Sequence, residues 1–250
     1  MVAEKYEGKM FMTQHHGELI VLDYEKYSKV LVKFLKTGYE TVTTMGCVKK
    51  GLVKDRLLPL KVTGGFLGNI GKKAKCSGSS KEYVRWVNMM YRCYGGENTA
   101  YYSAYKDCTV SDNFKDFTYF KEWCSNQIGF SEKGWHLDKD ILVKGNKEYS
   151  PETCCFVPKE VNLLFGKSTK HRGDCPIGVH FNKREGLYES YITCYKRRIH
   201  LGKFKASSEA FNTYKVAKEA YIKEVANKWK DEIDLRVYDA LMNYQVEITD

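Results

Sequence analysis

Residues Trp135–Asn162 read WHLDKDILVKGNKEYSPETCCFVPKEVN, and this stretch decides how the middle of the chain is expected to fold. WHLDKDIL predicts a strand whose alternation places His136, Asp138 and Asp140 on one side. KGNK predicts a turn. CCFVPKEVN then predicts a second strand or turn and a short helix that begins near Pro158. The whole has the size of a strand–loop–strand–helix unit that holds one metal ion.

The residues alone leave a second interpretation open. Asp138 and Asp140 are also compatible with solvated acids at the end of a strand, and His136 with a partly exposed strand histidine. Neither of these readings needs a metal ion.

The composition points to an acidic partner. The 250 residues carry a formal net charge of +10, a pI of about 9.0 and 19 tyrosines. A basic, tyrosine-rich protein most often binds a polyanion, and DNA or RNA is the usual one. The alternative is a positive charge that serves solubility alone.

The cysteines and the N-terminus bear on the cellular compartment in which the protein is expected. Nine cysteines are present, and none forms a CxxC pair. The N-terminus lacks the apolar run of a signal peptide, and no stretch approaches the roughly 20 apolar residues of a membrane span. We therefore expect reduced thiols in the cytoplasm, no membrane association and no structural zinc site.

Changes in composition divide the chain into four predicted parts, which together give an α+β fold class of several modules. Residues 1–64 predict a small β-barrel-like module, whose last strand is expected at Leu57–Val62. Residues 65–80 predict a flexible basic linker. Residues 81–170 begin with aromatic helices and contain the stretch quoted above. Residues 171–250 predict a three-stranded sheet, one helix and a helical tail.

The third part resembles a known family in the order of its elements. The matching segments are WVNMMYRC (Trp86–Cys93), Tyr105–Val110, Phe120–Trp123, LDKDI, YSPETC and Asn162. Together they resemble the HNH-type endonucleases of bacteriophage genomes, which are His-Me finger or ββα-metal nucleases and include homing enzymes. The resemblance spans about residues 83–162. It implies a ββα-metal core that hydrolyses phosphodiester bonds.

The resemblance also implies roles for matching positions. Asp138 matches a first-strand metal ligand and Asn162 the helix ligand that closes the site, with Mg²⁺ the expected ion and Mn²⁺ the alternative. Lys139 stands where the family has its general-base His, and Thr153 where it has its middle Asn. A lysine ammonium has no acceptor, so we expect Lys139 to grip the scissile phosphate and His136 to be the nearest substitute base. The catalytic candidates are therefore His136, Asp138, Lys139 and Asp140.

Residues 176–226 contain a second self-contained pattern, three short strands followed by a helix that Ser207 or Ser208 caps. The matching residues are Gly178-Val179, Tyr188, Ile192, Arg198–Phe204 and Glu209–Phe211. They resemble the plant ethylene-response-factor (Apetala-like) type of DNA-binding domain, which also occurs fused to phage HNH nucleases. The resemblance and the exposed cations of the sheet give these DNA-binding candidates: His180, Asn182, Tyr188, Thr193, Arg197, Arg198, His200 and Lys203. The alternative is a solvated sheet face.

The leading interpretation is a metal-dependent endonuclease of phage type that acts on double-stranded DNA in the cytoplasm of an infected bacterial host cell. Lys139 and Thr153 motivate the alternative, a catalytically inactive DNA-binding protein on a degenerate HNH scaffold. A third hypothesis has the N-terminal module bind a host protein. The sequence leaves the recognition site and the oligomeric state open.

Overall fold

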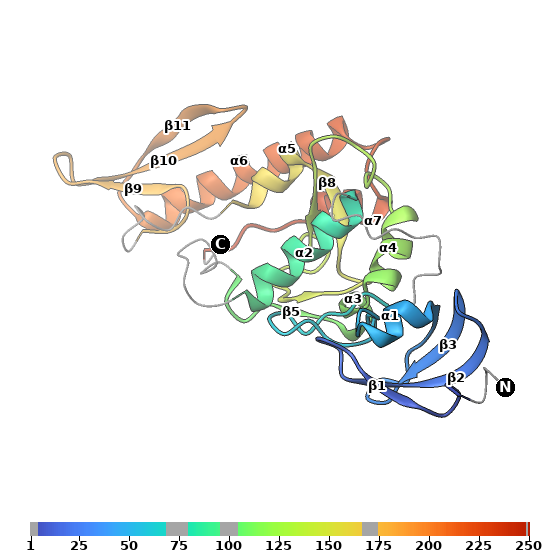
Figure 1. The fold of residues 1–250 in the computed structure, drawn as a ribbon. Helices are drawn as coiled ribbons and strands as arrows, with labels where there is room; N and C mark the ends of the chain where they lie inside the picture. The colour runs from blue at the N-terminus through green and yellow to red at the C-terminus, as the bar shows by residue number, and fades with distance from the viewer. Residues whose placement is uncertain (1–4, 69–79, 96–104, 167–174, 249) are drawn as a thin grey trace. The chain divides into compact units, whose positions relative to one another are not determined.

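The protein has a mixed α+β fold, which confirms the predicted fold class (Figure 1). Within the described residues the strands form four small sheets. In the same part of the chain, no helix is long and apolar enough to cross a membrane. The computed structural model describes these residues: 5–68, 80–95, 105–166, 175–248 and 250.

The chain divides into two compact units. One consists of Met1–Cys124 with Tyr149–Pro151, and the other of Ser125–Glu148 with Glu152–Asp250. This division differs from the predicted one, in which residues 81–170 form a single part. The predicted linker lies mostly outside the described residues.

The first unit begins with an antiparallel meander of four strands in the order β1-β2-β3-β4. Alternation along β2 and β3 buries Leu19 and Val21 against Val30 and Val32. No strand forms at residues 57–62, so that expectation was wrong; a short helix, α1, follows the meander instead. The bounds are β1 Met10–Met12, β2 Glu18–Lys26, β3 Lys29–Phe34, β4 Glu40–Thr43 and α1 Met45–Lys49.

The helices of the first unit pack around Trp86. Ser80 begins α2 by accepting a hydrogen bond from the Tyr83 amide, as an N-cap residue does. Trp86 is fully buried, and its indole Nε1 donates to the Phe114 carbonyl at 2.7 Å. Met89 and Met90 are buried on the same helix face. The elements are α2 Lys81–Tyr94, β5 Thr109–Val110, α3 Asp112–Lys115 and α4 Phe117–Ser125.

The second unit contains the predicted strand–loop–strand–helix. Strand β6 pairs antiparallel with β8, with His136 opposite Val157 and Asp138 opposite Cys155. Pro158 lies at the N-cap of the helix, where its fixed φ suits the first turn. The short strand β7 lies in the loop; its Tyr149 belongs to the first unit, and β7 pairs with β5 of that unit. The bounds are β6 Trp135–Asp138, β7 Glu148–Tyr149, β8 Cys155–Pro158, α5 Lys159–Asn162 and the 3-10 helix η2 Leu163–Phe165.

The second unit ends with a three-stranded antiparallel sheet, in the order β11-β10-β9, packed on the long helix α6. Gly178 has φ +77°, and a Cβ there would collide with the Tyr214 ring of α6, so glycine permits this close packing. Helix α6 begins after Ala206, which has no side-chain cap, so the expected serine cap was wrong. The elements are β9 Val179–Asn182, β10 Leu187–Cys194, β11 Arg197–Phe204, α6 Ser207–Lys228 and α7 Leu235–Met242.

We call β6, β8 and α5 together the ββα motif. Helix α6 joins the three-stranded sheet to this motif. At its C-terminal end, the Trp229 indole Nε1 donates to Glu160 Oε2 at 2.8 Å, and Lys228 Nζ lies 2.6 Å from the same oxygen. The Trp229 ring also meets the ring of Trp135 on β6 edge to face, with centroids 6.1 Å apart. A single helix therefore contacts both parts of the second unit.

Candidate functional site

Strand β6 ends at Asp138 because the carboxylate of that residue accepts hydrogen bonds from the backbone amides that follow. Asp138 Oδ1 accepts from the amides of Asp140 and Ile141, at 2.9 and 2.8 Å. Such a local side-chain-to-backbone turn competes with continuation of the strand. Asp140 therefore lies beyond the strand and is exposed, and the predicted strand through residue 142 was too long.

Asp138 is an unusually weak acid for a carboxylic side chain. Burial and the neighbouring Asp140 carboxyl raise its pKa from 3.8 to about 6, although the two backbone amides act in the opposite direction. Both causes disfavour the charged form. A divalent cation would favour that form, because it would offset the repulsion between the two acids.

His136 and Asn162 meet across the ββα motif. Asn162 Nδ2 lies 3.2 Å from His136 Nδ1, so helix α5 and strand β6 are joined at this point. His136 and Asp138 are two residues apart on β6, and alternation places them on the same face, opposite the buried Trp135 and Leu137. The structure thus brings His136 and Asn162 into contact and places Asp138 on the same face of β6 as His136.

The protonation of His136 depends on the orientation of the Asn162 amide. With Nδ2 facing the ring, Asn162 donates to Nδ1, and the ring proton is on Nε2. With the amide turned by a half rotation, Oδ1 would accept from Nδ1–H, which leaves a lone pair on Nε2. Only the second arrangement makes Nε2 a proton acceptor.

Lys139 closes the loop between the strands. Its side chain is buried, and Nζ donates to the Asn146 carbonyl at 2.9 Å and to Asp140 Oδ2 at 3.2 Å. Asn146 returns the contact, since its Nδ2 donates to the Lys139 carbonyl at 2.7 Å. Thr153 Oγ1 donates to the Glu148 carbonyl at 2.9 Å, within the same loop. Lys139 and Thr153 therefore both hold the loop between the strands.

Lys139→Met tests this structural task. The variant keeps an unbranched apolar side chain but leaves the Asn146 carbonyl and the Asp140 carboxylate without the ammonium. We expect a loss of about 1–3 kcal/mol in the free energy of unfolding, measured by chemical denaturation. Unchanged stability together with weaker DNA affinity would instead support the phosphate-gripping role predicted from the sequence.

The donor set at this site suits an oxygen-preferring ion. Within the described residues, no group of three or more His, Cys, Asp or Glu side chains is placed to hold a metal. The available donors are the Asp138 carboxylate and the Asn162 amide, with Asp140 adjacent. Carboxylate and amide oxygens with water suit Mg²⁺. Burial and Asp138 raise the pKa of the Cys155 thiol, which keeps it neutral and a poor ligand.

The outer face of the three-stranded sheet carries most of the predicted DNA-binding residues. Ser190 and Ile192 are buried toward α6, so the odd-numbered residues of β10 and their partners point away from the helix. Register places Tyr188 and Arg197 on the helix side of the sheet. The predicted residues on the outer face are His180, Asn182, Thr193, Arg198, His200 and Lys203.

The sequence did not identify Glu189 at the centre of this face. Its carboxylate accepts from Asn182 Nδ2 at 2.9 Å and from the Tyr191 hydroxyl at 2.7 Å, and Lys203 Nζ lies 3.8 Å away. These donors lower the pKa of Glu189. Arg198 lies over the Tyr191 ring, 3.9 Å from its centroid. Glu189 therefore orients the Asn182, Tyr191 and Lys203 side chains on the outer face.

Comparison with known proteins adds no relative. No protein-family model matches this sequence, and neither a curated protein nor a solved structure was found that matches it. Function is therefore argued from the site itself.

Proposed function

We propose that this protein is a divalent-metal-dependent endonuclease that hydrolyses phosphodiester bonds in double-stranded DNA. The observation that carries the proposal is the ββα motif, in which Asn162 of the helix contacts His136 of the first strand. Asp138, two residues further along that strand, has a carboxyl group with a raised pKa. Perturbed acids next to a histidine are typical of functional sites.

The roles follow from the chemistry of each group. Asp138 and Asn162 would hold the ion, which when bound supplies charge stabilisation for the leaving oxygen. His136 Nε2 would take the proton of the attacking water, with the Asn162 amide turned so that Oδ1 accepts from Nδ1–H with one lone pair and binds the ion with the other. Asp140 would contribute charge near the ion from the loop. Lys139 supports these groups by holding the loop closed.

The outer face of the three-stranded sheet would bind the duplex. Arg198 and His200 are exposed on this face, and the Glu189 carboxylate at its centre is already hydrogen-bonded. Side chains of this kind contact phosphates and base edges in the major groove. The net charge of +10 would draw the protein to DNA before any specific contact forms.

Cleavage of supercoiled plasmid tests the proposal. We expect the purified full-length protein to nick or cut the plasmid with Mg²⁺ or Mn²⁺ and to do neither with EDTA. DNA affinity should fall linearly with the logarithm of salt concentration. Salt-sensitive binding without metal-dependent cleavage would contradict the nuclease and support a non-catalytic DNA-binding protein.

A further inference from the structure

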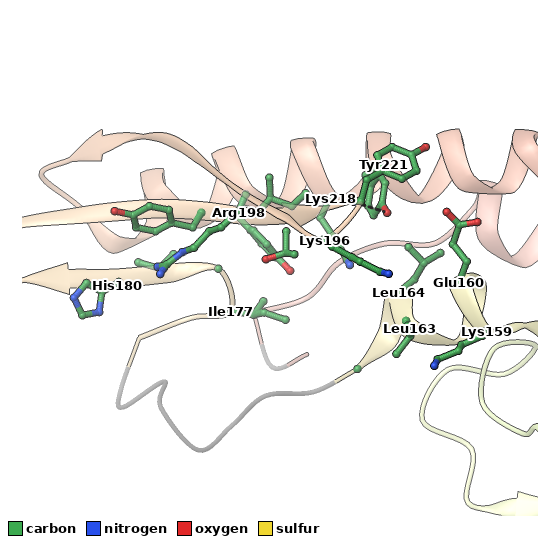
Figure 2. Close-up of a pocket in the computed structure, with 18 residues that line it drawn as sticks. Lys159, Glu160, Leu163, Leu164, Ile177, His180, Lys196, Arg198, Lys218 and Tyr221 are labelled. Atoms are coloured by element: carbon green, nitrogen blue, oxygen red, sulfur yellow. Dashed lines mark hydrogen bonds between the residues drawn. The ribbon is translucent and has the colours of Figure 1, made fainter.

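A pocket of about 1030 Å³ opens within the second unit, and neither His136 nor Asp138 lines it. One side comes from the α5–η2 segment and includes Leu163 and Leu164. The other side comes from α6, the β10–β11 turn and the neighbouring sheet residues, among them His180 and Arg198 (Figure 2). Pockets for small organic ligands usually measure roughly 300–1,000 Å³, so a nucleotide fits this one.

The charge of the pocket lining is positive. Among the described residues that line it, the one carboxylate is Glu160, which already binds Lys228 and Trp229; together these two partners lower its pKa. Neither of those two partners lines the pocket. The cations that do line it are Lys159, Lys196, Arg198 and Lys218. The pocket therefore suits an anion.

Lys218 of α6 is half-buried in the pocket wall. Burial lowers the pKa of its ammonium group. Within the part of the chain that the structure describes, no ion pair is found between Lys218 and an acidic side chain. Its Nζ lies 5.9 Å from the centroid of the Tyr221 ring. A cation that is desolvated in this way gains more from an incoming anion than a solvated one does.

The turn between β10 and β11 is strained where it lines the pocket. Tyr195 and Lys196 both have positive φ, 49° and 65°, as the central residues of a type I′ turn do. Asn-Gly is the preferred pair at such a turn, and a side chain there strains the backbone. Both residues line the pocket. Strain of this kind persists where function requires particular side chains.

The Tyr195 ring is exposed but held in place. Its hydroxyl donates to Glu224 Oε1 at 2.9 Å, and its ring meets that of Tyr221 edge to face at 5.2 Å. The backbone amide of Tyr195 donates to the Tyr221 hydroxyl at 3.2 Å. A fixed, exposed aromatic ring beside cations is the arrangement on which nucleic-acid bases stack.

We propose that this pocket binds a nucleotide, with Lys196 and Lys218 holding its phosphate and Tyr195 stacking on its base. The nucleotide belongs either to a single DNA strand or to a free mononucleotide. This goes beyond the proposed function, because the pocket binds its ligand whether or not the ββα motif cleaves DNA.

Two lysine variants on the same helix test the phosphate contact. Lys218→Gln removes a charge inside the pocket, and Lys223→Gln removes one from the exposed side of α6 as a matched control. In titrations of full-length protein with fluorescent oligo(dT), we expect Lys218→Gln to weaken binding about tenfold and to reduce the salt slope by about 0.7. Lys223→Gln should change binding less than twofold. Equal effects in the two variants would overturn the proposal.

Competition identifies the source of the nucleotide. If dTMP displaces oligo(dT) from wild-type protein but not from Lys218→Gln, the ligand is a free nucleotide. If dTMP and inorganic phosphate fail and only longer strands compete, the ligand is part of a strand. Absence of any Lys218-dependent binding by either ligand rejects the site. The titrations are run in EDTA, where no metal-dependent cleavage takes place, so a failed nuclease and a failed pocket give different results.

The strained turn offers a variant that cannot be confused with unfolding. Replacing Tyr195-Lys196 by Asn-Gly supplies the residues that the turn prefers, and this offsets the lost Tyr195 contacts to Glu224 and Tyr221, so we expect the melting temperature to stay within about 4 °C of wild type. The same double variant should lose at least tenfold in oligo(dT) affinity, because the stacking ring and one cation are gone. A variant with a melting temperature like that of wild type and unchanged affinity would contradict the proposal.

Discussion

Asp138→Asn is expected to reduce metal-dependent cleavage by at least about a thousandfold and, at the same time, to stabilise the protein at neutral pH. The activity loss follows because an amide replaces the charged ligand in the proposed site. Metal ions contribute several kcal/mol to the transition state, and about 4 kcal/mol corresponds to a factor of a thousand. The asparagine Oδ1 still accepts from the Asp140 and Ile141 amides, so the turn is retained.

The gain in stability follows from the raised pKa. Folding lifts the pKa of Asp138 from 3.8 to about 6, so the folded state binds its proton more tightly than the unfolded state. Below about pH 4 both states are protonated and the ionisation cost is absent. As pH rises from about 4 to 6 the unfolded state ionises first, and stability is lost. Above about pH 6 the variant avoids this cost, which we place at about 1–2 kcal/mol because Asp138 remains partly exposed.

Chemical denaturation at several pH values, with and without Mg²⁺, measures both effects. The stability difference between Asp138→Asn and wild type should be near zero at pH 4 and full at pH 7. Mg²⁺ should raise the stability of the wild type and leave the variant unchanged. The exposed Asp231→Asn provides the control, with normal cleavage and a normal metal response. A variant that cleaves like wild type would remove Asp138 from the site.

His136→Ala should lower the cleavage rate by about 10²- to 10⁴-fold, the range that general-base catalysis contributes. Its metal-induced stabilisation should persist, because the proposed ligands Asp138 and Asn162 remain. Added imidazole should restore part of the rate, since it can occupy the space of the missing ring. His15→Ala, an exposed histidine of the first unit, is the control.

Two outcomes separate the possible roles of His136. Loss of the metal response along with activity would make it a ligand or a structural residue. Full activity would show that the attacking water is activated without His136, and this would rule out His136 as the base.

Periodic patterns made much of the fold predictable. The apolar stripe that includes Trp86 and Met90 requires a buried helix face, and the alternation around Ile192 requires a strand. Pro158 marks the start of a helix because its φ is fixed. Helix α1 was missed because it has five residues, fewer than two turns, and so shows no period.

The site was less predictable because its contacts depend on the path of a loop. The residues that follow Lys139 in the sequence do not indicate that its ammonium group reaches the Asn146 carbonyl, seven residues later. The early end of β6 at Asp138 depends on one carboxylate capturing two amides. Glu189 was passed over because an acid on a DNA-facing sheet looks unfavourable until its donors are known.

Helix α6 has 22 residues, and at 1.5 Å per residue it is roughly 33 Å long. One turn of B-DNA measures roughly 34 Å. Since the helix packs against the three-stranded sheet and contacts the ββα motif at its C-terminal end, it would set a fixed spacing between the bases that are read and the bond that is cut. A nuclease of this design would cut at a constant offset from its recognition sequence.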